Sequence, residues 1–292
     1  MRSSFLTVLG VLLVCASLPA CQRKADTAPA LVTPTVTLSR SDVGVGTPIE
    51  MTYHFEVAPD ASLTEDYLVF VHFVDADREL MWTDDHMPPV PTSQWKAGSP
   101  VEYSRTVFIP KFPYVGEASV EVGLYSAATG ERVPMSGDNQ GQRSYRVAGL
   151  TMGTQTNNLF VVFKDGWQDA EISNEGAGIE WQWSKKAGVV AFRNPKRDAV
   201  FYLQVDQPLA QVGVQHVDVR MGDTVIDSFD LPPGQLALRK IPLTQAQFGD
   251  GETGEITIEA EKTFVPAAIP ELKSNDAREL GVRVMRAYLQ PS

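Results

Sequence analysis

Short runs in which apolar and polar residues alternate extend through most of the chain, and this period of two constrains the fold more than any other feature. In residues 49–57, the apolar side chains Ile49, Met51, Tyr53, Phe55 and Val57 occupy every second position, with polar residues between them. Successive side chains of a strand point to opposite faces, so this pattern predicts a strand with one buried face. No amphipathic helical repeat of comparable strength interrupts the series. We therefore expect an all-β protein.

Residues 35–152 contain roughly seven such runs, separated by turn residues, which is typical of an immunoglobulin-like sandwich. One run, from Tyr67 to Val74, is apolar on both faces, as expected for a central strand. The last part of this region, from Gly137 to Asn157, is rich in Gly, Gln, Asn, Ser and Thr. We place a domain boundary near its end, between 152 and 157.

Residues 157–290 contain about eight or nine further runs, a number that suits a jelly-roll sandwich. Gly222-Asp223 lies between two alternating runs, which predicts a tight hairpin with a positive φ angle at its tip. The segment Pro270–Glu279 is expected to be a loop with a single helical turn. The predicted fold is thus two consecutive antiparallel β-sandwiches, immunoglobulin-like and then jelly roll.

The beginning of the chain has the features of an export signal. A positive charge at position 2 precedes an apolar run over residues 5–14, which is too short to span a bilayer. The sequence Leu18-Pro19-Ala20-Cys21 resembles the cleavage motif of bacterial lipoproteins, in which Leu and two small residues precede Cys, although Pro19 departs from it. This resemblance implies that residues 1–20 are removed and that Cys21 becomes lipidated.

The resemblance also implies a cellular location. We expect an exported protein, anchored to the cell envelope through the lipid on Cys21, with residues 21–34 as a flexible tether because they lack periodicity. Gln22, rather than an acidic residue, follows the expected lipidated Cys. By resemblance to sorted lipoproteins, this favours the outer over the inner membrane.

The composition excludes several kinds of partner. The chain has 36 acidic and 25 basic residues, for a formal net charge of −11, and its acidity is spread over both halves. Without a basic stripe, neither nucleic acid nor anionic lipid headgroups are expected partners. Only Cys15 and Cys21 occur, and Cys15 lies in the expected signal, so we expect no internal disulfide and no Cys-based metal or redox site.

No catalytic motif stands out, and we expect no enzyme. The four His are scattered without H-E-x-x-H spacing, and both a G-x-S-x-G elbow and a phosphate-binding Gly loop are absent. A carboxylate pair for glycoside hydrolysis cannot be singled out among so many acids. We expect no cofactor apart from one candidate cation site.

That candidate is Asp75, Asp77 and Glu79, which offer oxygen atoms at alternate positions, the ligand type that Ca²⁺ prefers. The cluster lacks the Gly and the distal Glu of a helical calcium loop. A solvated hairpin tip between Val74 and Leu80 explains the same residues. Both interpretations are open from the sequence.

Aromatic residues supply the candidate ligand-binding surface, because a flat ring suits the apolar face of a sugar. The candidates are Trp82, Trp95, Trp167 and Trp181, with Arg193 as a source of hydrogen bonds to hydroxyl groups. The first two flank a Pro-rich loop, the third follows a turn, and the fourth lies on a predicted strand. Each ring could instead fill a core, Trp95 as a plug at one end of a sandwich. Solvent exposure of the rings decides between these alternatives.

Three sets of motifs resemble known modules. The sequences at 68–77 (LVFVHFVDAD), 91–98 (PTSQWKAG) and 122–125 (VGLY) resemble a β-sandwich module appended to bacterial membrane glycosyltransferases and cell-envelope proteins. Residues 217–231 resemble the strand–hairpin–strand of galactose-binding-like jelly rolls. The motifs at 264–267 and 276–282 resemble a module at the ends of bacterial glycosyltransferases. No transferase domain accompanies them, so the resemblance implies saccharide binding rather than transfer.

These features predict a non-catalytic, membrane-anchored envelope lipoprotein that recognises or scaffolds a cell-surface saccharide or glycosylation machinery. The alternative is a structural or protein-binding envelope component without a glycan site.

Overall fold

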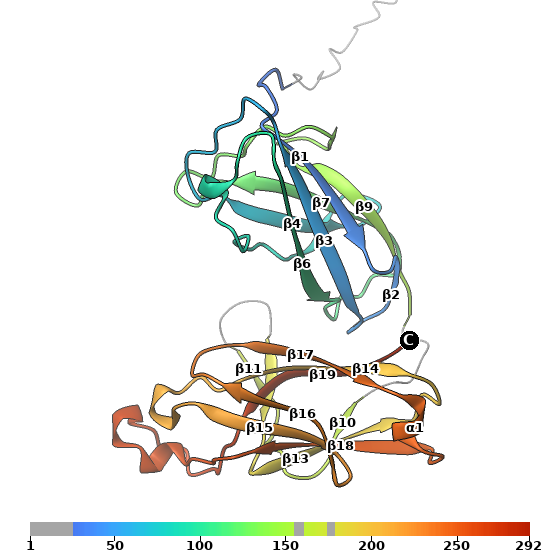
Figure 1. Cartoon of the computed structure of the whole chain (residues 1–292), viewed down its shortest axis with the longest axis vertical. Helices are drawn as coiled ribbons and strands as arrows, with labels where there is room; N and C mark the ends of the chain where they lie inside the picture. Colours follow the sequence, from blue (N-terminus) through green and yellow to red (C-terminus); the bar gives the residue numbers. More distant parts are fainter. Residues whose placement is uncertain (1–25, 155–160, 174–178) are drawn as a thin grey trace, which may run out of the picture.

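The computed structural model describes residues 26–154, 161–173 and 179–292, and in these ranges almost all regular structure is β. Two β-sandwiches follow one another along the chain (Figure 1). The predicted fold class is therefore confirmed. The expected signal and Cys21 lie outside the described residues.

The first sandwich packs a three-stranded sheet, β1-β3-β6, against a larger sheet in the order β2-β9-β7-β4-β5, where β8 also pairs with β9. Its pairs are antiparallel except for β2 with β9, which is parallel. The elements are β1 (Val32–Leu38), β2 (Asp42–Val43), β3 (Pro48–Val57), β4 (Leu68–Val74), β5 (Leu80–Thr83), the 3₁₀ turn η1 (Thr92–Gln94), β6 (Pro100–Phe108), β7 (Gly116–Tyr125), β8 (Asp138–Asn139) and β9 (Tyr145–Met152).

The predicted alternation in β3 is confirmed by burial. Ile49, Met51, Tyr53 and Phe55 are fully buried, and they pack in one hydrophobic core with residues of the opposite sheet. The polar residues between them face outward; His54, for example, contacts Glu102 of β6. The core of this sandwich is therefore built from one face of each sheet, as the period of two requires.

Strand β4 buries side chains on both of its faces. Val69, Val71 and Phe73 point into the core, whereas Phe70 lies on the opposite face and is only 1% exposed. The outer face of this sheet is therefore covered, and the cover comes from the segment between β7 and β9, whose Arg132 lies over the Phe70 ring. This covered outer face positions the candidate site.

The second sandwich consists of two five-stranded antiparallel sheets, in the orders β10-β13-β18-β15-β16 and β11-β12-β19-β14-β17. Its elements are β10 (Val162–Phe163), β11 (Glu171–Ile172), β12 (Glu180–Trp183), β13 (Ala187–Arg193), β14 (Ala199–Asp206), η2 (Ala210–Val212), β15 (Gln215–Met221), β16 (Thr224–Leu231), β17 (Ala237–Leu243), the helix α1 (Gln245–Phe248), β18 (Thr253–Ala260), η3 (Pro266–Ala268), η4 (Pro270–Leu272) and β19 (Arg283–Pro291). Within the described ranges, no helix has the length and apolarity needed to cross a bilayer.

The turns of the second sandwich follow the sequence with one exception. Gly222 has a φ angle of 58° at the tip of the β15–β16 hairpin, and the single turn in 270–279 is η4, both as predicted. The exception is the run of residues from Gln211 to Met221, in which strand β15 begins only at Gln215. Gly213 has a φ angle of 72°, which interrupts the extended run and leaves Ala210–Val212 as a 3₁₀ turn.

The two sandwiches touch through a few side chains. Lys111, which follows β6, donates to both carboxylate oxygens of Glu180 in β12 at 2.8 and 3.1 Å. Lys240 of β17 pairs with Glu50 of β3. The ring of Phe108 packs edge-on against Tyr202, with 6.0 Å between their centroids. The end of β3 and β6 that makes these contacts is opposite to the end at which the described chain enters (Figure 1).

Candidate functional site

A depression with a volume of about 1790 Å³ opens on the outer face of β4 and β7. His72 of β4 and Glu121 of β7, which are paired in register, contribute to its floor. Its walls come from the β4–β5 turn, from residues 130–145 between β7 and β9, and from residues 26–30 at the start of the described chain. Four segments that are distant in sequence thus build one concave surface.

Three arginines from separate positions converge on this depression. Arg78 Nη2 donates to the Gln140 carbonyl at 2.8 Å, and Arg132 Nη1 donates to the Gln142 carbonyl at 2.8 Å. Arg143 Nη1 donates in turn to the Arg132 carbonyl. Each guanidinium carries five N–H donors, so these backbone bonds leave Arg78 and Arg132 with donors for a ligand.

Arg132 is held in place by an aromatic ring. Its guanidinium carbon lies 4.2 Å from the centroid of Phe70, a cation–π contact. Phe70 in turn lies over Gly123 of β7, where a Cβ atom would come within 2.2 Å of the ring. Within the described residues, Arg132 forms no ion pair with a carboxylate. The charge of Arg132 is therefore positioned by the Phe70 ring and by the Gln142 carbonyl, and no acid of the described residues pairs with it.

The floor combines a buried acid with an imidazole. Glu121 is 5% exposed; its Oε2 accepts a hydrogen bond from Ser144 Oγ at 2.6 Å, and its Oε1 lies 3.6 Å from Arg78 Nη2. The half-buried His72 ring lies 4.7 Å from that of Phe70. In the described part of the chain, neither nitrogen of His72 makes a hydrogen bond. A neutral imidazole with both nitrogens available offers one donor and one acceptor.

Backbone strain gathers at the same place. Among the described residues, five other than glycine have positive φ angles, and three of them line the depression: Arg78 at 69°, Gln142 at 51° and Arg143 at 55°. Such conformations cost about 1–2 kcal/mol per residue and cluster at functional sites. The strain therefore supports the depression as the candidate site, although Lys196 and Lys273 show the same conformation elsewhere.

The start of the described chain is fixed against this depression. Asp26 Oδ2 accepts from Arg143 Nε at 2.6 Å, and this hydrogen bond lowers the pKa of the Asp26 carboxyl. The Leu31 amide donates to the Pro134 carbonyl at 2.9 Å, and β1 begins at Val32. The tether expected over residues 21–34 is therefore too long at its C-terminal end. Residues 26–34 are ordered by bonds to distant segments, which their own aperiodic sequence does not reveal.

The predicted calcium ligands lie at the β4–β5 turn. Asp75 Oδ1 accepts from the backbone amides of Asp77 and Glu79, at 3.0 and 2.8 Å, and Arg78 adopts its positive φ angle between them. No group of three His, Cys, Asp or Glu side chains among the described residues could hold a metal ion. The geometry is that of a hairpin tip, because Asp75 Oδ1 accepts from two backbone amides of the turn.

The two tryptophans of the first sandwich belong to its core. Trp95 is 7% exposed, its ring lies 5.1 Å from that of Phe55, and its Nε1 donates to the Val90 carbonyl. Trp82 is half-buried and stacks on Phe73 at 4.5 Å. Trp95 is the plug that the sequence allowed. The Trp95 ring offers no open face for a sugar, because it packs against the core.

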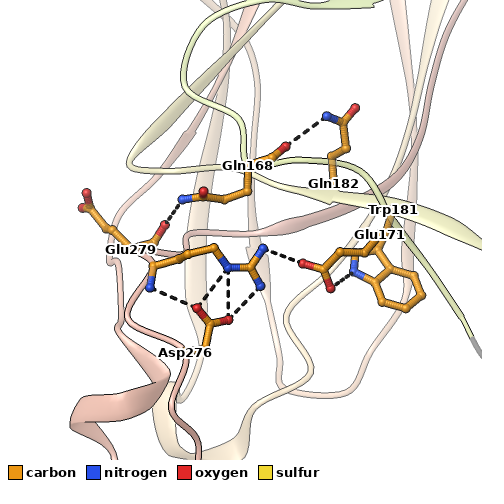
Figure 2. Close-up of polar contacts among 7 residues, drawn as sticks. Gln168, Glu171, Trp181, Gln182, Asp276 and Glu279 are labelled. Carbon is orange, nitrogen blue, oxygen red and sulfur yellow. Dashed lines mark hydrogen bonds and ion pairs between the residues drawn. The ribbon is translucent and has the colours of Figure 1, made fainter.

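The two candidates in the second sandwich are also held by neighbours. Trp167 donates through Nε1 to the Val189 carbonyl at 2.8 Å and packs against Phe163. Trp181 donates through Nε1 to Glu171 at 3.1 Å (Figure 2). Arg193 is exposed at the end of β13.

Figure 2 shows the polar cluster beside Trp181. Glu171 accepts from Trp181 with one carboxylate oxygen and from Arg278 Nη1 with the other, at 2.8 Å. Arg278 also binds Asp276 through Nε and Nη2. Gln168 donates to the Glu279 carbonyl at 2.9 Å. Because the charges of Glu171, Asp276 and Arg278 are paired with one another, the cluster pins the 264–280 segment against β11 and β12 and leaves few groups for a ligand.

Among the described residues, none of those predicted for a site lines the depression. Arg78 lies within the acidic motif Asp75–Glu79, and Arg132 and Arg143 lie in or near the polar stretch that precedes the predicted domain boundary. One sequence signal could have found the site. The run from Tyr67 to Val74 is apolar on both faces, which requires a cover on the outer face as well as a core on the inner one.

Comparison with known proteins identifies no family. No protein-family model matches the chain, and no curated protein sequence does. A solved structure of the alkylpurine DNA glycosylase AlkC of Pseudomonas fluorescens matches with 15% identity and a TM-score of 0.28, over 43% of this chain and 31% of that one. This chain thus spans about a third of the glycosylase.

Carbohydrate-binding modules are also among the matches. The CBM36-1 domain of a multidomain xylanase from the hindgut metagenome of Trinervitermes trinervoides is 10% identical, with a TM-score of 0.28, and the match covers 46% of this chain and 98% of the module. A CBM36 module in complex with calcium and xylotriose is 11% identical, with a TM-score of 0.26, over 46% of this chain and 94% of that one. Matches at these scores carry no argument about the ligand of this chain.

Stability of the first sandwich is expected to fall as the pH drops below about 6.5, the ordinary pKa of histidine. Burial lowers the pKa of both His72 and His86. Below about pH 6.5, the unfolded chain therefore binds more protons at these two residues than the folded chain does. Stability therefore rises with pH through the window between the folded and unfolded pKa values and levels off above it. Urea unfolding at pH 5.5 and 7.5 measures this difference.

The control is His72→Gln, which removes one of the two groups. The variant should show a smaller loss of stability between pH 7.5 and 5.5 than the parent. His216 titrates with the opposite sign, because its hydrogen bond to Asp230 raises its pKa, but it is present in both proteins and cancels. Equal pH dependence in parent and variant would contradict the assignment to His72.

Proposed function

We propose that this protein is an exported, lipid-anchored envelope protein that recognises a saccharide in the arginine-lined depression and does not transform it. The observation that carries the proposal is the mixture of groups in the lining. Arg78 and Arg132 retain donors, Glu121 provides a carboxylate, and His72 provides both a donor and an acceptor. A sugar hydroxyl is itself both donor and acceptor, so it suits a surface on which the two kinds of group alternate.

The charge of the lining supports a polyol rather than a polyanion. Besides the three arginines, the depression is lined by the carboxylates of Asp26, Glu121 and Glu131, so the formal charges balance. The whole chain is strongly acidic, with a net charge of −11. Neither the site nor the surrounding field therefore attracts a highly charged anion.

Binding without turnover is supported by the roles of the two titratable groups. The Glu121 carboxylate accepts from Ser144 and faces Arg78, which makes it a fixed acceptor rather than an acid. Among the described residues, no side chain hydrogen-bonds to His72 to orient it as a general base. Attachment to the envelope is supported by the resemblance of the Leu18–Cys21 sequence to lipoprotein cleavage motifs.

Arg132→Ala is expected to weaken saccharide binding about 10- to 100-fold, the effect of losing hydrogen bonds from a charged donor. A glycan array identifies the sugar, and titration calorimetry with that sugar measures the dissociation constants. Arg193→Ala is the matched control, because Arg193 is an exposed arginine that does not line the depression, and it should bind like the parent.

Three results would overturn the proposal. A glycan array without any bound sugar would refute saccharide recognition. Unchanged affinity in Arg132→Ala would show that the depression is not the binding site. Degradation of the bound sugar during incubation would refute binding without turnover. Weakened binding in Arg193→Ala alone would place the sugar on the second sandwich instead.

A structural or protein-binding role is the second candidate, and the tryptophans favour it. Trp95 is buried, and the indole nitrogens of Trp95, Trp167 and Trp181 all donate to protein acceptors. Aromatic stacking, which motivated a sugar ligand in the sequence, is therefore not what these rings provide. A silent glycan array would leave this role as the better account.

A further inference from the structure

We infer that the depression faces the membrane to which the chain is anchored and that its ligand is the sugar headgroup of a glycolipid in that same membrane. This inference rests on the proposed function, because it uses both the lipid on Cys21 and the saccharide site. It adds the source of the sugar and the orientation of the molecule.

The first step is the reach of the anchor. Only residues 22–25 separate Cys21 from Asp26. Whatever path these residues take, five Cα-to-Cα steps span at most about 18 Å. A lipid on Cys21 lies in the bilayer, so Asp26 cannot be farther than about that distance from the attachment point.

The second step is the position of Asp26 itself. Asp26, Ala28 and Ala30 line the depression, and Arg143 holds Asp26 through two hydrogen bonds, Nε to Oδ2 at 2.6 Å and Nη2 to Oδ1 at 3.4 Å. Asp26 Oδ1 also accepts from the Ala28 amide at 3.1 Å. The short tether is therefore fastened at the rim of the depression and not at a remote point of the sandwich.

The third step concerns the rest of the molecule. The chain enters the first sandwich at the end opposite to the second sandwich (Figure 1). An anchor at that end holds the depression near the bilayer and directs the second sandwich away from it. Leu80 lines the depression and is 53% exposed, so the lining also offers an apolar side chain to a lipid.

The fourth step selects the ligand. A headgroup in the same membrane meets the site at a high effective concentration, which raises apparent affinity by about 100-fold or more without any new contact. The balanced charge of the lining and the acidity of the chain favour an uncharged sugar headgroup over an anionic phospholipid. A neutral glycolipid therefore fits both the location and the chemistry.

Orientation is tested with the full lipidated chain in phosphatidylcholine vesicles. The expected mature chain has no cysteine besides the lipidated Cys21, so N139C places one dye at the depression and D223C places one at the β15–β16 turn of the second sandwich. Energy transfer to acceptor-labelled headgroups should be strong from position 139 and weak from position 223. Inserting twenty Gly/Ser residues between Gln22 and Arg23 should reduce the transfer from position 139.

The ligand is tested with synthetic dialkyl lipids that carry glucose, galactose, N-acetylglucosamine or glucuronic acid. The soluble methyl glycoside of the bound sugar should compete with the glycolipid in the same vesicle only at a concentration about 100-fold above its own dissociation constant. The lengthened tether should reduce this advantage. Phosphatidylglycerol vesicles without glycolipid serve as the anionic comparison and should not protect the dye at position 139 from an aqueous quencher.

The outcomes separate this inference from the proposed function. Binding of a soluble sugar together with equal energy transfer from both positions would refute the membrane-facing orientation and leave saccharide recognition intact. Protection of the dye at position 139 by phosphatidylglycerol vesicles would show that the ligand is an anionic headgroup and not a sugar. Absence of binding to every sugar, soluble or lipid-linked, would refute the proposed function itself.

Discussion

Arg283→Ala is expected to lower the free energy of unfolding of the second sandwich by about 3 kcal/mol, because it leaves a buried carboxylate without its partner. Arg283 of β19 binds Asp206 of β14 with two hydrogen bonds, Nε to Oδ1 at 2.8 Å and Nη2 to Oδ2 at 2.6 Å. The Asp206 side chain is only 9% exposed. The guanidinium also lies 5.2 Å from the Trp181 centroid and 5.8 Å from that of Trp183, so packing is lost as well.

Urea unfolding monitored by far-UV circular dichroism measures this change. Lys164→Ala is the matched control, because it breaks an exposed ion pair with Glu255 and should change the stability far less than Arg283→Ala does. The double variant Arg283→Met with Asp206→Leu should recover most of the loss, since it removes both charges from the interior. A loss in Arg283→Ala no larger than in Lys164→Ala would show that Asp206 does not depend on its arginine.

Gly123→Ala is expected to destabilise the first sandwich by about 2–3 kcal/mol through overpacking. The added Cβ would lie 2.2 Å from the Phe70 ring and 2.8 Å from the Arg143 carbonyl. Phe70 has no room to retreat, because Arg132 lies over it and His72 packs beside it. The displaced ring would move Arg132, so saccharide binding at the depression should weaken in parallel.

Gly149→Ala controls for the change of residue type. Gly149 lies in the neighbouring strand β9, and its added Cβ would meet nothing closer than 3.8 Å. The free energy of unfolding of the Gly149→Ala variant should differ from that of the parent by less than about 0.5 kcal/mol. Thermal or urea unfolding of both variants gives the comparison. Equal stability of the two alanine variants would contradict the close packing of Phe70 on β7.

The relation between sequence and structure is clearest in β4. Apolar residues on both faces predicted a central strand from Tyr67 to Val74, and the structure has β4 at Leu68–Val74 with burial on both faces. What covers the outer face could not be deduced from the strand. The cover includes Arg132, and the residues that follow at 136–144 are polar and Gly-rich and have no periodicity that would indicate where they lie.

For the tryptophans, the sequence could not separate a role in the core from a role in ligand binding. Their positions in the sequence were compatible with either a core or a stacking surface, because both environments select large flat rings. Only the contacts of each ring separate these alternatives. For Trp95, the Phe55 ring on one side and the Val90 carbonyl at the indole nitrogen decide for the core.

The sequence by itself determined the all-β class, the two-sandwich build, the hairpin at Gly222 and the absence of internal disulfides in the expected mature chain, because a period of two, turn residues and cysteine content act locally. Only the tertiary structure decided that Arg78, Arg132 and Arg143 meet beside His72 and Glu121. These arginines lie in turns and loops, and such segments take their conformation from the distant carbonyls, carboxylates and rings that bind them. No local sequence pattern predicts that these arginines lie together, so the candidate site can be recognised only in the folded structure.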